Sequence, residues 1–246
     1  MNRKKVAKLI AVVVLVGAVG AGGSLALLTA QSHQVTNTFV VGKGLVDQDL
    51  VLDEAHMKNA EDEDQDGEWT VNRTETPTGE FEYEADSSQP RVEKNKYVNL
   101  QADDDIYKDP TVHVLADTAD CYLFINVKGV DALSGKGITI DAINNNLGKT
   151  WKKVNGDKSN KVDGIYYLAK GEADFEHQVV KNNPNAVQNF MIFESLNADN
   201  NMFDSYGNSV ITEADTIQIK ACAVQATGVT PQEAENQLPN RFTNWE

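Results

Sequence analysis

The stretch that decides the fold is CYLFINVK, residues 121–128. Its odd-numbered residues from Cys121 to Val127 are all apolar, whereas Asn126 and Lys128 fall on the other face. This alternation is typical of a strand with one buried face. Comparable short apolar runs stand at 38–42, 45–52, 111–115, 190–193 and 216–225. Many short strands with turns between them and few helical segments predict an all-β fold, a sandwich or a barrel.

Two short helices and one hairpin are expected among these strands. Residues 141–147 form one helical segment that stops at Gly148. Thr230 to Glu233 is a capping box with proline at the first helical position, which predicts a second helix. Asn155-Gly156, between the apolar runs 151–154 and 164–168, predicts a hairpin turn.

Residues 1–26 predict export. Four cations precede an apolar run at 9–19 and a zone of small residues at 20–26, which is the layout of a secretory signal peptide. Ser24 and Ala26 are the best pair of small residues one apart, so we expect cleavage before Leu27.

An uncleaved membrane anchor is the alternative, because residues 9–28 carry no charge and are about as long as a membrane-spanning helix. We favour cleavage, since four glycines weaken the second half of this segment as a helix. In either case the rest of the chain lies outside the cytoplasm.

The exported part, residues 27–246, is long enough for a single domain with a real core. The whole chain has a formal charge of −15, and loss of the four N-terminal cations makes the remainder more acidic still. Such a surface repels nucleic acid and anionic lipid, so we expect neither as a partner, and membrane contact only through the signal segment before cleavage.

Residues 61–86 contain eleven acids and a single base, Arg73. We therefore expect a solvated, mobile insertion at about 57–90. Within it Asp62, Asp64 and Asp66, followed by Gly67, match the first half of a calcium-binding loop. Arg73 stands where such a loop has its bidentate glutamate, so we favour a solvated acidic run and expect no cofactor, with calcium as the alternative.

No catalytic motif is present in the sequence. The four histidines, at 33, 56, 113 and 177, lack the spacing of a zinc protease, and no nucleophile elbow occurs. Cys121 and Cys222 lie on strands whose alternation turns the two thiols to different faces, so we favour two separate buried thiols over a disulfide.

Several stretches together resemble the TasA and camelysin-like family of SipW-dependent secreted proteins of Gram-positive bacteria. They lie at the end of the signal, at 37–42, at 108–114, at 120–127 and at 219–226. The chain departs from the family at Cys222, where a tyrosine is expected, and in the acidic insertion.

The resemblance implies a jelly-roll β-sandwich at the cell surface or in the extracellular matrix, processed by a SipW-type signal peptidase. It also implies a fibre subunit whose N-terminal strand completes the sheet of the next copy or of a related matrix protein. Residues 27–41 are uncharged and β-prone, and Val35, Phe39 and Val41 would fill pockets from one face. An ordinary first strand, a secreted camelysin-like protease and a calcium-dependent adhesion module are the alternatives.

Overall fold

The computed structural model describes residues 45, 49–73, 83–140, 151–154, 161–171, 173, 175–212 and 214–245, and the backbone of 29–31. It is mostly β, as the sequence predicts. The largest sheet runs in the order β1 (Thr29–Gln31), β15 (Gln218–Gln225), β8 (Cys121–Lys128), β11 (Gly164–Leu168) and β10 (Trp151–Lys153), with β12 (Val179–Val180) also on β8. All of its strand pairs are antiparallel.

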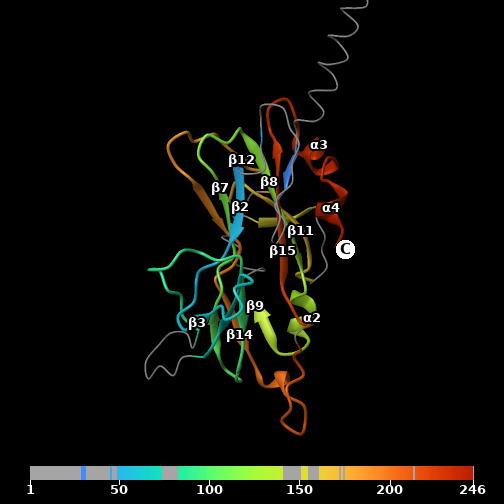
Figure 1. Ribbon diagram of the computed structural model, residues 1–246. Helices are drawn as coiled ribbons and strands as arrows, with labels where there is room; N and C mark the ends of the chain where they lie inside the picture. The colour runs from blue at the N-terminus through green and yellow to red at the C-terminus, as the bar shows by residue number, and fades with distance from the viewer. Residues whose placement is uncertain are drawn as a thin grey trace, which may run out of the picture.

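A second sheet, β13 (Gln188–Met191), β7 (Thr111–Val114) and β2 (Leu50–Asp53), packs on one face of the large sheet. The other face carries α3 (Pro231–Asn236) and α4 (Asn240–Thr243). Figure 1 shows this order of layers, with the large sheet between β2 and β7 on one side and the two helices on the other. The sandwich part of the prediction is therefore confirmed.

Two smaller sheets extend the molecule at the other end (Figure 1). One is β6 (Asp105–Tyr107), β14 (Ser195–Ala198) and β9 (Ile138–Ile140); the other is β3 (Ala60–Glu61), β4 (Glu68–Val71) and β5 (Lys94–Tyr97). The short helices α2 (Val130–Ser134) and η3 (Asn200–Met202) lie beside β9 and after β14.

β8 is buried on both faces, which differs from the half-buried strand that its alternation predicts. Cys121, Leu123, Ile125 and Val127 belong to the main core with the second sheet, and Tyr122 and Phe124 to a smaller core under the helices. The prediction fails on the second face because the aromatic side chains there are covered by residues more than a hundred positions later. Seven consecutive residues of β8, 121–127, are buried.

The chain leaves β8 through Gly129, whose φ of 97° few other residues adopt. A Cβ at this position would lie 2.0 Å from the carbonyl oxygen of Thr216, so no side chain fits. The glycine lets α2 begin at once. This helix was not expected from the sequence, whereas the helix expected at 141–147 lies outside the described residues.

The C-terminal helices are fixed by polar groups of the sheet. The Asn126 amide donates to the carbonyl oxygen of Phe242 at 2.7 Å, and the Lys220 ammonium donates to those of Arg241 and Asn244, each at 2.8 Å. Asn126 is 3 % exposed. The capping box of Thr230 and Glu233 is confirmed at the start of α3.

In the described parts of the acidic segment, residues 61–67 are almost all exposed, as expected, whereas the residues on either side of them belong to the folded domain. Residues 57–73 and 83–90 contain β3, β4 and the bridged residues Met57 and Tyr83. Met57, Val71 and Tyr83 have at most 1 % of their surface exposed and join the main core. Glu68 pairs with Lys94, which follows the segment, and Glu84 pairs with Lys58 within it, so neighbouring cations offset part of this charge.

Replacing Asn126 with alanine should lower the free energy of unfolding by about 1–3 kcal/mol, because two buried helix-end carbonyls lose their donor. Urea denaturation measures the change. Asn185→Ala is the control, since Asn185 is exposed, and should alter stability by less than about 0.5 kcal/mol. Equal stability of the two variants would contradict the role given to Asn126.

Candidate functional site

The N-terminal strand lies at the edge of the large sheet. β1 is antiparallel to β15, with Ala30 opposite Ala223 and Gln31 opposite Cys222. β1 begins two residues after Leu27, where the predicted mature chain starts. Residues 29–31 are therefore placed against the last strand of the chain.

A cavity of about 690 Å³ opens beside the first half of β15. We call it the edge cavity. Its apolar wall comes from β2, β15, the sheet of β6, β9 and β14, the helices α2 and η3, and loop residues, and it includes Leu52, Leu100, Ile106, Leu133, Ile138, Leu196, Met202, Ile211, Ile217 and Ile219. This volume and this lining are typical of sites that hold an apolar group in proteins.

The lysines that line the edge cavity are paired with carboxylates of the protein. Lys94 and Lys96 both pair with Glu68, and Lys108 pairs with Glu54. Glu54 also accepts the backbone N–H of Asn95 at 2.7 Å. Because the cations that line the cavity have carboxylate partners, the cavity suits an apolar occupant better than an anionic one.

A polar network joins β2 to β7 next to this cavity. Arg91 donates to the carboxylates of Asp53 and Asp109, at 2.5 and 2.8 Å. The Asp109 carboxylate also accepts the backbone N–H of Ala55 at 2.7 Å. The segment 108–110, quoted above for the family resemblance, thus connects the two strands, and Thr111 follows as the first residue of β7.

His113 belongs to the same network. Its Nε2 lies 2.8 Å from Oδ1 of Asp53, and its Nδ1 lies 2.7 Å from Oδ1 of Asn189. The hydrogen bond to Asp53 raises the pKa of His113 above its ordinary value, and burial only partly opposes this. The alternation of 111–115 places His113 on the polar face of its strand, but its partners could not be read from the sequence.

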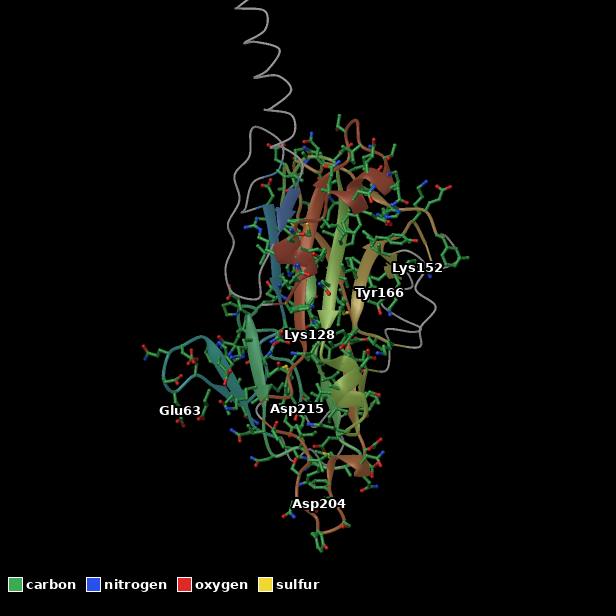
Figure 2. The ribbon with its side chains drawn as sticks, turned by 90° about the vertical axis from the view of Figure 1, so that its right-hand side faces the viewer. Glu63, Lys128, Lys152, Tyr166, Asp204 and Asp215 are labelled. Carbon is green, nitrogen blue, oxygen red and sulfur yellow. The ribbon has the colours of Figure 1, made fainter. Side chains whose placement is uncertain are left out.

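The three aspartates of the half calcium motif do come together. One carboxylate oxygen of each of Asp62, Asp64 and Asp66 lies within 4.8 Å of the others, in the turn between β3 and β4. Figure 2 shows the neighbouring Glu63 on this turn, which projects from the side of the molecule. Arg73, at the twelfth position, donates instead to the 1 % exposed Asp104 at 2.8 Å. With one oxygen from each carboxylate the set supplies three of the six to eight oxygens that calcium takes, so waters or backbone carbonyls would have to supply the rest.

Both cysteines are free and fully buried. Cys121 lies in the main core and Cys222 in the smaller one, so the prediction of thiols on opposite faces is confirmed. Burial raises the pKa of the Cys121 thiol to about 12 and that of Cys222 further. Two buried protonated thiols are poor nucleophiles.

The described histidines do not gather. Among the residues that the structure describes, the one group of three or more potential metal ligands is the aspartate set, which contains no histidine. His56 packs edge-on against Trp69, with ring centroids 4.4 Å apart. His113 and His177 lie on different faces of the sandwich.

The other predicted site residues lie outside the described ones. These are Ser24, Ala26 and Leu27 at the cleavage point and Val35, Phe39 and Val41 in the proposed exchanged segment. Within the described ranges no helix is both long and apolar enough to cross a membrane.

Comparison of the chain with family models, with curated proteins and with solved structures finds no match.

His113→Gln should lower the free energy of unfolding more at acidic pH than at basic pH. Because the pKa of His113 is raised in the folded state, its contribution is fully present below the unfolded value of about 6.5. The contribution is lost as the pH rises through the folded-state pKa. Urea unfolding at pH 5.5 and 8.5 tests this; an equal loss of stability at both pH values would contradict it.

Proposed function

We propose that the protein is an exported structural subunit that self-associates at the cell surface or in the extracellular matrix. In this proposal the N-terminal segment of one copy adds as a strand to the sheet edge of the next. The observation that carries it is the position of β1, a three-residue strand seated at the edge of the large sheet on β15. A SipW-type signal peptidase would free this segment by cutting before Leu27.

A strand of this kind suits exchange between copies for a physical reason. Main-chain hydrogen bonds supply affinity in strand addition, and they form equally well with a strand from the same or from another chain. β1 is short, and the uncharged stretch that contains it costs little to desolvate. Pairing within one copy and pairing between copies therefore differ little in energy, and concentration decides between them.

The edge cavity supports an apolar donor. Its apolar wall includes Leu52, Ile217 and Ile219, close to the edge on which β1 is seated. Val35, Phe39 and Val41 are the large apolar side chains of one face of the N-terminal segment, and we propose that they occupy this cavity in the neighbouring copy. Buried apolar side chains then add to the main-chain hydrogen bonds.

Protein that starts at Leu27 should assemble with increasing concentration, whereas protein that starts at Lys43 should stay monomeric, because it lacks the added strand. Salt should favour assembly, since the acidic chains repel each other at low ionic strength. Sedimentation velocity and electron microscopy of the same samples provide the measurement. Monomers of both forms at all concentrations would contradict the proposal.

A mixing experiment separates donor from acceptor. Phe39→Ser impairs the donor, with Val40→Ser as the control on the other face of the strand, and Ile217→Lys impairs the acceptor. Neither Phe39→Ser nor Ile217→Lys should form chains alone, but an equal mixture should form dimers, because the intact donor of one meets the intact acceptor of the other. Absence of dimers from the mixture, with both variants folded, counts against the edge cavity as acceptor.

A further inference from the structure

His177 is buried where α3 contacts the large sheet. Its ring stacks on Tyr167, with centroids 3.8 Å apart and planes 9° from parallel, and Tyr122 meets it edge-on at 6.0 Å. Glu235 of α3 faces the same ring, with Oε1 3.0 Å from Nε2. The two side chains are only 10 % and 9 % exposed, so this is an ionisable pair enclosed between a helix and a sheet.

The pair is close but not satisfied. Nε2 of His177 is buried, and although it lies close to Glu235 the angle between the two groups does not allow a hydrogen bond. The hydroxyls of the two surrounding tyrosines are used elsewhere, since Tyr122 donates to Val229 and Tyr167 to Phe175. A charge on His177 can therefore be offset only by Glu235 among these neighbours; the adjacent Glu176 is exposed and pairs with Lys170.

We propose that the enclosed His177–Glu235 pair is an acid-sensitive element between α3 and the large sheet, and that acid releases α3 and α4 from the sheet while the main core stays folded. The contact goes beyond self-association at the β15 edge, because it lies on the helix-covered face. Release would uncover the smaller core, which contains Phe124, Cys222 and Phe242.

The titration of the two groups gives the direction of the effect. Burial lowers the pKa of His177 to about 4, so its contribution to stability is present above the unfolded value of about 6.5 and is lost as the pH falls toward 4. Burial raises the pKa of Glu235, so that carboxyl is protonated before His177 and then offers no countercharge. Because the pKa of Glu235 is higher when α3 lies on the sheet, protonation of Glu235 alone stabilises this closed form. Release of the helices is therefore confined to the acid end of this range.

The two cysteines provide a built-in readout. Cys222 lies in the smaller core with Ala234 of α3 and Phe242 of α4, and Cys121 lies in the main core on the other face of the sheet. A disulfide reagent that reacts in acid, such as 4,4′-dithiodipyridine, can label each thiol only when its surroundings open. The ratio of the two labelling rates cancels the pH dependence of the reagent.

Between pH 7 and pH 4 the rate for Cys222 relative to Cys121 should rise, by up to about 100-fold if His177 alone governs opening, because His177 titrates at about 6.5 in the open form and at about 4 in the closed form. His177→Gln should abolish the rise, and His177→Phe serves as a second variant if the first is poorly folded at pH 7. Glu176→Gln, at the exposed residue next to His177, is the matched control and should keep the rise. Both thiols reacting together, neither reacting down to pH 4, or an unchanged rise in the folded His177 variants would each overturn the proposal.

Discussion

Burial of β8 on both faces is the constraint on which the other elements of the fold depend. The second sheet covers one face of β8, and α3 and α4 cover the other. Removing either layer would therefore expose an apolar surface. Asn126 lies on this strand, and Lys220 lies opposite it on β15. Their donors bind carbonyl groups at the end of α4, which otherwise lack partners within so short a helix. The same strand thus fixes the core and the C-terminal segment.

The assembly that we propose depends on the edge of the large sheet at β15. β8 occupies the middle of the large sheet and β15 is held along its whole length by β8, so β15 offers a firm edge. β1 is seated on that edge over three residues. The edge cavity lies beside it, with an apolar wall and a charged wall whose lysines are paired. In the proposed assembly, an apolar strand from a second copy would meet both the main-chain edge and the cavity without displacing an ion pair.

The sequence predicts those features that depend on neighbouring residues. The strand at 121–128, the strands that flank the Asn155-Gly156 turn, the capping box of α3 and the opposite faces of the two cysteines all follow from local patterns. The strands at the ends of the acidic segment are not predicted, because composition counts Glu68 and Glu84 but does not show that they pair with Lys94 and Lys58. The second buried face of β8, the polar network of Arg91 and the His177–Glu235 contact also join residues that are far apart in the sequence, so local patterns do not predict them. The helix α2 was missed because five residues after a glycine carry too weak a periodic signal.

Pairing of β1 with β15 between different chains is the central claim, and a cross-link tests it directly. Ala30 and Ala223 are opposite each other in the two strands, so cysteines there can be joined. One chain carries Ala30→Cys and a second carries Ala223→Cys, both with the native cysteines replaced by serine. After the two are mixed and oxidised, the account predicts a disulfide-linked heterodimer on a non-reducing gel. A cross-link that forms only when both cysteines are in the same chain would contradict it.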